Sequence, residues 1–219
     1  MRIGLIVPSS NTVMEPDFHR ALGADFTIST TRIFLESVTP EAETRMLEQD
    51  LPKAIDLIQT TAPDVVVFGC TSAGALGHDA QIAGRIAHGT GAKVVTVLGA
   101  VQTQLRRIAP NSLAVFTPYI DELTDRVAIS LAEAGITPIK SAGMGIRQNL
   151  EIGRIPPVEI ISFVESSAED CSPDCIFLSC TNWRAIEALE ELQRGFGIPI
   201  VTSNQAAIDA VRYLRTTEK

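Results

Sequence analysis

Two cysteines, Cys70 and Cys180, have similar surroundings in this chain and could carry out chemistry together. Cys70 follows the apolar run Val65–Phe68, Cys180 follows the run Cys175–Ser179, and small hydroxyl residues come directly after each thiol. A thiolate is a strong nucleophile, and a positioned thiol can give or take a proton. Two thiols that face each other across a cleft could therefore act on a small substrate from opposite sides. The alternative, a buried structural cysteine, is common for a single thiol but less expected for a matched pair.

The two cysteines belong to a pattern that repeats after 110 residues (180 − 70). Other landmarks recur at this offset or close to it: Pro8 and Pro118, Asp64 and Asp174, and Gly91 and Gly197. Such a repeat indicates that one structural unit is present twice. We therefore expect a first α/β lobe at residues 1–109, which carries Cys70, and a second at residues 110–219, which carries Cys180. The sequence leaves open whether the final helix packs back on the first lobe.

Short apolar runs rich in Val and Ile alternate with segments of helical periodicity, which is typical of parallel sheets covered by helices. The expected strands are Ile3–Val7, Phe26–Thr31, Val65–Phe68, Val94–Leu98, Leu113–Phe116, Thr137–Ala142, Cys175–Ser179 and Ile198–Thr202. The expected helices are Pro16–Leu22, Glu41–Thr60, Ala73–Thr90, Ala100–Ile108, Ile120–Ala134, Pro156–Ser167, Arg184–Phe196 and Gln205–Arg215. The pattern predicts an α/β fold of two pseudo-symmetric, Rossmann-like lobes with parallel sheets and an active-site cleft between them. Ligands of such folds bind beyond the carboxyl ends of the strands, where both cysteines fall.

Composition and charge exclude several classes of function. The 219 residues are 45% hydrophobic and 20% charged, as in globular proteins, and the net charge of −8 argues against nucleic-acid binding. No apolar run approaches the roughly 20 residues of a membrane span, and we find no signal peptide, so we expect a cytoplasmic protein with free thiols. The spacing Cys171-x3-Cys175-x4-Cys180 is poor for zinc, and neither a dinucleotide fingerprint nor a phosphate loop is present. We therefore expect no metal and no cofactor.

Polar side chains near the same strand ends could hold an acidic ligand. The candidates are Asn11, Thr71, Ser72, Tyr119, Asn149 and Thr181. The asparagines could instead be turn or cap residues, and the tyrosine a half-buried surface residue. A helix that starts directly after Cys70 would favour its thiolate and would bind a carboxylate beside it. The arginines at 147, 154 and 184 are further options, and the segment Phe34–Gln49, rich in Thr and Glu, is a candidate lid.

Six short segments, which together span nearly the whole chain, are distinctive as a set. They are Val7-Pro-Ser-Ser-Asn-Thr-Val-Met-Glu-Pro16, Phe68-Gly-Cys-Thr-Ser-Ala73, Phe116-Thr-Pro-Tyr119, Asn149-Leu-Glu-Ile-Gly-Arg-Ile155, Leu178-Ser-Cys-Thr-Asn182 and Val201-Thr-Ser-Asn-Gln205. With them the chain resembles the aspartate/glutamate racemase superfamily, and within it the branch of maleate cis–trans isomerases and arylmalonate decarboxylases. The decarboxylases have glycine where this chain has Cys70, and glutamate racemases have histidine in the tripeptide that begins at the second cysteine. The chain therefore most resembles the maleate isomerases.

The resemblance implies a cofactor-independent reaction that converts maleate to fumarate. In it, Cys70 adds to a carbon of the double bond, Cys180 gives or takes the proton on the neighbouring carbon, and the single bond of the adduct rotates. Asn11, Tyr119 and Asn149, with the N–H groups after the cysteines, would hold the two carboxylates of the small dicarboxylate substrate. A homodimer or higher homo-oligomer is also implied. Two alternatives stay open: a two-cysteine amino-acid racemase or epimerase, and a non-catalytic small-carboxylate binding protein.

Overall fold

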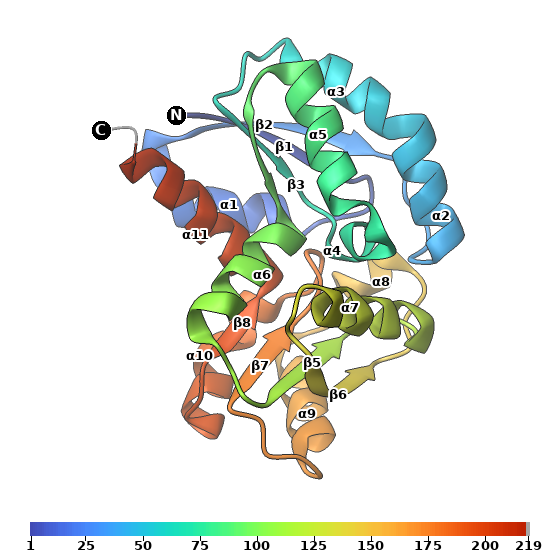
Figure 1. Cartoon of the computed structure of the whole chain (residues 1–219), viewed down its shortest axis with the longest axis vertical. Helices are drawn as coiled ribbons and strands as arrows, with labels where there is room; N and C mark the ends of the chain where they lie inside the picture. The colour runs from blue at the N-terminus through green and yellow to red at the C-terminus, as the bar shows by residue number, and fades with distance from the viewer. Residues whose placement is uncertain (218–219) are drawn as a thin grey trace.

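Two four-stranded parallel sheets form the centre of the molecule, which is described for residues 1–217 by a computed structural model. The first sheet has the order β2-β1-β3-β4, and the second has the order β6-β5-β7-β8 (Figure 1). The strands are β1 (Arg2–Pro8), β2 (Thr27–Ile33), β3 (Val65–Phe68), β4 (Lys93–Thr96), β5 (Leu113–Thr117), β6 (Pro138–Gly143), β7 (Cys175–Leu178) and β8 (Ile200–Thr202). The second order is the first with four added to each strand number, so the repeat in the sequence is a repeat of topology. The predicted α/β fold of two related lobes is confirmed.

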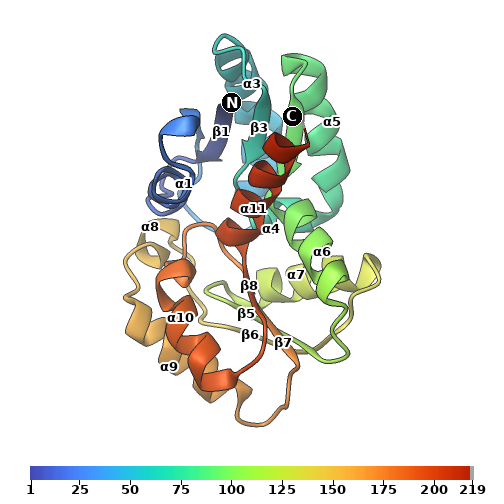
Figure 2. The same cartoon turned by 90° about the vertical axis from the view of Figure 1, so that its left-hand side faces the viewer.

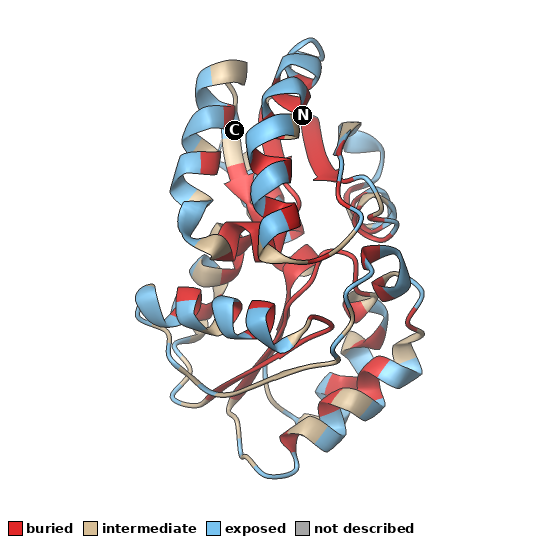
Figure 3. Ribbon diagram, turned by 90° about the vertical axis from the view of Figure 1, so that its right-hand side faces the viewer, coloured by how far each residue is buried: buried red, intermediate tan, exposed pale blue. Residues whose placement is uncertain are grey.

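Helices cover both faces of each sheet, and their apolar sides are buried (Figure 3). They are α1 (Met14–Leu22), α2 (Pro40–Arg45), α3 (Leu51–Gln59), α4 (Thr71–Ala73), α5 (Asp79–Thr90), α6 (Val97–Ile108), α7 (Asp121–Glu133), α8 (Asn149–Ile152), α9 (Pro157–Ala168), α10 (Ala185–Phe196) and α11 (Ser203–Thr216). A 3₁₀ turn at Gly23–Asp25 and π-helical turns at Met46–Asp50 and Gly74–His78 complete the helical segments. No helix within residues 1–217 is long and apolar enough to cross a bilayer.

Equivalent threonines end the last strand of each sheet and start the next helix. The Thr96 hydroxyl accepts the N–H of Gly99, and the Thr202 hydroxyl accepts the N–H of Gln205. Such side-chain caps satisfy helix N–H groups that have no intrahelical partner. The strand predicted at Val94–Leu98 is therefore wrong at its end, because the chain turns into α6 directly after Thr96.

The final helix α11 follows the last strand of the second sheet but packs on the first half of the chain. It contacts α1, α6 and β4, and it lies beside α6 in two perpendicular views (Figures 1 and 2). Arg212 extends this contact, since its guanidinium donates to the Ala21 carbonyl at 2.6 Å. The helix therefore ties the last strand of the second sheet to the first half of the chain.

Candidate active site

The two cysteines lie at the carboxyl ends of the central strands β3 and β7, where the two sheets meet. The Thr181 hydroxyl, directly after Cys180, donates to the Gly69 carbonyl, directly before Cys70, at 2.9 Å. A second bridge joins the Thr71 hydroxyl to Ser203 at 2.9 Å. Both thiols are only 5% exposed. The strand ends that carry the thiols are therefore in direct contact, as a reaction on one small substrate requires.

The predicted amide donors lie around the same junction and connect the lobes. Asn11 donates from Nδ2 to the Thr181 hydroxyl at 3.0 Å, and its Oδ1 accepts the N–H groups of residues 13 and 14 at the start of α1. Asn149 donates from Nδ2 to the Ser10 hydroxyl at 2.8 Å. Each carboxamide nitrogen carries two N–H groups, so each keeps a second donor for a ligand. Asn11 is thus a cap residue and a cross-lobe residue at once.

Asn182 is a further cross-lobe residue, which the sequence analysis did not single out as a site residue. Its Oδ1 accepts the N–H of Thr12 at 2.8 Å, and its Nδ2 donates to the Asn149 carbonyl at 2.6 Å. Its backbone N–H donates to Cys180 Sγ at 3.3 Å. The residue therefore fixes the position of the second thiol relative to the first lobe.

Burial dominates the electrostatics of Cys70. It raises the pKa of this thiol far above its ordinary value, and the nearby Glu43 carboxyl raises it further, against the weaker effects of hydrogen bonds with the Ala73 N–H and the Ser72 side chain. We expected the helix start to favour a thiolate, and this expectation is wrong for the free protein. The helical segment that starts at Thr71 is interrupted at Gly77, so its dipole is too small to offset the loss of solvation. Cys70 is a neutral thiol until a base removes its proton.

Cys180 is also held as a thiol, but its neighbours differ. Burial raises the pKa of Cys180 to about 12, while hydrogen bonds from the Tyr119 hydroxyl and the backbone N–H groups of Asn182 and Trp183 oppose the rise. Tyr119 is 2% exposed, so it is not a half-buried surface residue, and burial raises the pKa of its phenol well above the usual range. These donors would stabilise a thiolate at Cys180 once its proton has been transferred.

The loop after β5 fixes the position of Tyr119. Its N–H donates to the Thr117 hydroxyl at 3.0 Å, and its carbonyl accepts the Gly145 N–H at 2.9 Å. Gly143 packs so closely against the Tyr119 carbonyl that a side chain there would collide with it. A glycine at 143 therefore allows the phenol to approach the second thiol.

Glu43 is, with Asn182, a site residue that was not predicted from the sequence. It lies on α2 with 0% exposure, its Oε1 accepts a hydrogen bond from the Ser72 hydroxyl, and its Oε2 has no partner among the described residues. Burial raises the pKa of Glu43 to about 8, against the hydrogen bond from Ser72. The spacing of Glu43 from the apolar residues that follow it could have indicated its burial, because residues 43, 47, 51, 54 and 58 form one buried stripe along a helical segment. Glu43 lies within the segment that we expected to act as a lid.

Other polar groups lie away from the thiols or face solvent. Residues 147 and 154 are exposed, Arg184 forms an ion pair with Glu187, and no Lys, Arg or His is buried within residues 1–217. Cys175 lies inside β7 and Cys171 in the loop before it, and the described His, Cys, Asp and Glu residues form no cluster of three that could hold a metal. The site therefore offers neutral donors rather than cations to a carboxylate.

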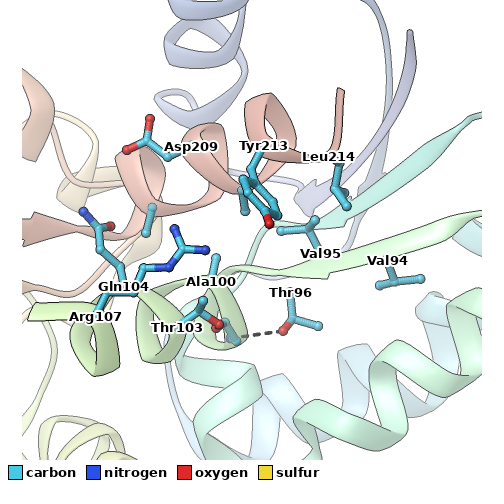
Figure 4. A pocket seen from close by; sticks show the side chains of 13 residues that line it. Val94, Val95, Thr96, Ala100, Thr103, Gln104, Arg107, Asp209, Tyr213 and Leu214 are labelled. Atoms are coloured by element: carbon cyan, nitrogen blue, oxygen red, sulfur yellow. Dashed lines mark hydrogen bonds between the residues drawn. The ribbon is translucent and has the colours of Figure 1, made fainter. Parts of the chain in front are cut away.

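A separate cavity lies between β4, α6 and α11 and includes neither thiol (Figure 4). Its polar groups include Gln104, Asp209 and Arg107, whose guanidinium carbon lies 5.4 Å from the centre of the Tyr213 ring. The cavity contains no cysteine, histidine or glutamate. Its lining therefore has no thiol, and the meeting point of β3 and β7, which has two, is the candidate active site.

Comparisons with known proteins show which family the chain belongs to. The maleate isomerase of Geobacillus stearothermophilus is 27% identical, over 94% of this chain and 88% of that protein. The arylmalonate decarboxylase of Bordetella bronchiseptica is 29% identical, over 96% of this chain and 89% of that protein. A solved structure of a Nocardia farcinica maleate cis–trans isomerase mutant, with a covalently bound succinylcysteine intermediate, superimposes with a TM-score of 0.89 at 26% identity and covers 99% of this chain and 92% of its own. A model of the arylmalonate decarboxylase family matches residues 3–218. The chain belongs to the arylmalonate decarboxylase family.

Proposed function

We propose that this protein is a cofactor-independent isomerase that converts maleate to fumarate through a covalent adduct on Cys70. The observation that carries the proposal is the pair of thiols at strand ends joined by the contact from Thr181 to Gly69. The Nocardia relative holds a succinylcysteine, which is the product expected when a cysteine adds to maleate. A pair of thiols supplies both groups that such an addition needs, a nucleophile and an acid.

The reaction proceeds by addition, rotation and elimination. The Cys70 thiolate forms a C–S bond with one alkene carbon, the π electrons move to the neighbouring carbon, and that carbon takes the proton of Cys180. The former double bond is now a single bond and rotates. Cys180, now a thiolate, removes a proton from the same carbon, the double bond forms again, and the C–S bond breaks to release fumarate and the Cys70 thiolate.

The donors around Cys180 match the charge that this step creates. When Cys180 gives its proton to carbon, negative charge moves from Cys70 to Cys180. The Tyr119 hydroxyl and the Asn182 N–H already point at that sulfur, so they stabilise the charge without rearrangement. We assign the single hydroxyl proton of Tyr119 to this role, which leaves the amide N–H groups to bind the carboxylates.

The two carboxylates are held by neutral donors in this proposal. Asn11 and Asn149 each keep an N–H for a ligand. Thr71, Ser72 and Thr181 supply backbone N–H groups beside the thiols, because their hydroxyl protons are donated to Ser203, Glu43 and the Gly69 carbonyl. Rigid N–H groups that converge on one point bind anions without a cation. The reaction requires free thiols, so we place the enzyme in a reducing compartment such as the cytoplasm. A homo-oligomer stays a prediction from the resemblance.

Incubation with maleate in deuterated water, followed by proton NMR, tests the function. We expect fumarate to form with the natural protein and no turnover with Cys70→Ser, while the circular dichroism spectrum stays unchanged. The rival function is a two-thiol racemase, since each thiol could serve one face of an acidic carbon. Deuterium exchange at the α-carbon of aspartate or glutamate without any fumarate from maleate would favour the racemase and refute our proposal.

A further inference from the structure

The buried carboxyl group of Glu43 has no role in the reaction as described above. It is 0% exposed, it faces α4 from α2, and one of its oxygens has no partner among residues 1–217. Burial of a carboxyl group with an unsatisfied oxygen destabilises a fold, and an apolar residue would fill the same space without that penalty. A titratable group kept in such a place is a candidate for a functional role.

Hydrogen bonds connect Glu43 to one of the two thiols and not to the other. Cys70 Sγ lies 3.7 Å from Ser72 Oγ, and the Ser72 hydroxyl donates to Glu43 Oε1. Cys180, in contrast, is contacted by the Tyr119 hydroxyl and by backbone N–H groups, which are donors. Cys70 is therefore the thiol with a path to a proton acceptor, and Cys180 is the thiol surrounded by groups that stabilise its anion.

We propose that Glu43 accepts the proton of Cys70 through the hydroxyl group of Ser72. The proposal rests on the proposed function, in which Cys70 is the nucleophile. In the forward step the Cys70 S–H proton moves to Ser72 Oγ while the Ser72 proton moves to Glu43 Oε1. The products are a Cys70 thiolate, an unchanged serine and a neutral Glu43, so the net negative charge of the group is conserved. The reverse transfers restore the thiol after Cys70 leaves the adduct.

The protonation state of Glu43 determines the pH range in which it can accept the proton of Cys70. Burial raises its pKa to about 8, so the carboxylate that accepts a proton is the main form only above that pH. The titratable groups coupled to it are Cys70 from the β3 end, Cys180 from the β7 end and Tyr119 from the β5 loop. Each of them is neutral at pH 8, because burial raises all three pKa values.

The test measures labelling of Cys70 by iodoacetamide between about pH 6 and pH 10, resolved from Cys180 by peptide mass spectrometry. In the natural protein we expect the rate at Cys70 to rise up to about pH 8 and then to level off. In Glu43→Gln the rate at pH 8 should fall by about tenfold or more, since general bases contribute typically 10²–10⁴-fold, and the inflection should disappear. Glu41→Gln, on the exposed side of the same helix, is the matched control and should behave as the natural protein.

The outcomes separate a proton path from a simple charge effect. A carboxylate that acts only as a nearby charge raises the pKa of Cys70, so its removal would speed labelling, and that result would overturn the proposal. Ser72→Ala is the second variant, because it interrupts the path and keeps Glu43; it should also slow labelling, and adding Glu43→Gln should slow it no further. An unchanged circular dichroism spectrum of each variant reports an intact fold. Since no turnover is measured, a failure to isomerise maleate would refute the proposed function and leave this test valid.

Discussion

The buried carboxyl group of Glu43 gives the free energy of unfolding a specific dependence on pH. Folding raises the pKa of Glu43 from 4.5 to about 8, so the folded chain keeps a proton that the unfolded chain releases above pH 4.5. The stability contributed by the neutral acid is complete below pH 4.5 and is lost as the pH rises to about 8. At about 1.4 kcal/mol per pKa unit, the total loss is roughly 5 kcal/mol.

Replacement of Glu43 by glutamine should remove this loss and keep the shape of the side chain. Between about pH 5 and pH 9, the free energy of unfolding of Glu43→Gln should come to exceed that of the natural protein by several kcal/mol. This is a large effect, because the whole free energy of unfolding of a typical domain is only about 5–15 kcal/mol. Urea unfolding can be followed by the fluorescence of Trp183, which is the only tryptophan of the chain and is 1% exposed in the fold. Glu41→Gln again controls for the loss of a carboxylate.

The measured quantity is the difference in unfolding free energy between variant and natural protein at each pH. A difference that grows from acidic to alkaline pH supports a neutral, buried Glu43. Two curves that stay parallel over the whole range would show that folding does not shift the ionisation of this group. They would also remove the electrostatic basis of the proton path to Cys70.

Three further changes have defined outcomes. Cys180→Ser should abolish turnover of maleate and let the adduct on Cys70 accumulate, which intact-protein mass spectrometry detects; an enzyme at full rate without this thiol would refute the assigned acid. Gly69→Ala would place a Cβ 2.5 Å from Met14 Sδ, so the free energy of unfolding should fall by about 1–3 kcal/mol, which a lower melting temperature would report. An unchanged melting temperature would contradict the close packing of Gly69 against Met14. Asn11→Ala removes two cap bonds and one cross-lobe bond, and urea unfolding should show a loss of about 1–3 kcal/mol; a loss below 0.5 kcal/mol would refute its structural role.

The sequence was informative about the sheets because the information is local and occurs twice. Val65–Phe68 is an apolar run of four residues, all buried, and its counterpart Cys175–Leu178 has the same pattern. A short apolar run of this kind is the sequence pattern typical of a strand that is buried on both faces of a parallel sheet, so both strands could be predicted. The four-residue helix α8 was not predicted, since an element of one turn has too few residues to show a period.

The electrostatics of the site could not be predicted in the same way. A helix start after Cys70 suggested a thiolate, yet the pKa of that thiol depends on burial by residues from both lobes. Glu43 was also missed, because Glu is a common surface residue in helices and its burial follows from the packing of α2 on α4. Both properties depend on distant parts of the chain that come together only in the fold.

The two lobes repeat one topology, but the two thiols differ in their proton chemistry, and this difference bears on the reaction. Cys70 is linked through Ser72 to a carboxyl group that can accept a proton, whereas Cys180 faces hydrogen-bond donors that stabilise its anion. A racemase needs each thiol to act as base in one direction and as acid in the other, which favours matched surroundings. An addition to a double bond needs one nucleophile that loses its proton and one acid that gives its proton to carbon. The unequal surroundings of the two thiols therefore favour the isomerase over the racemase.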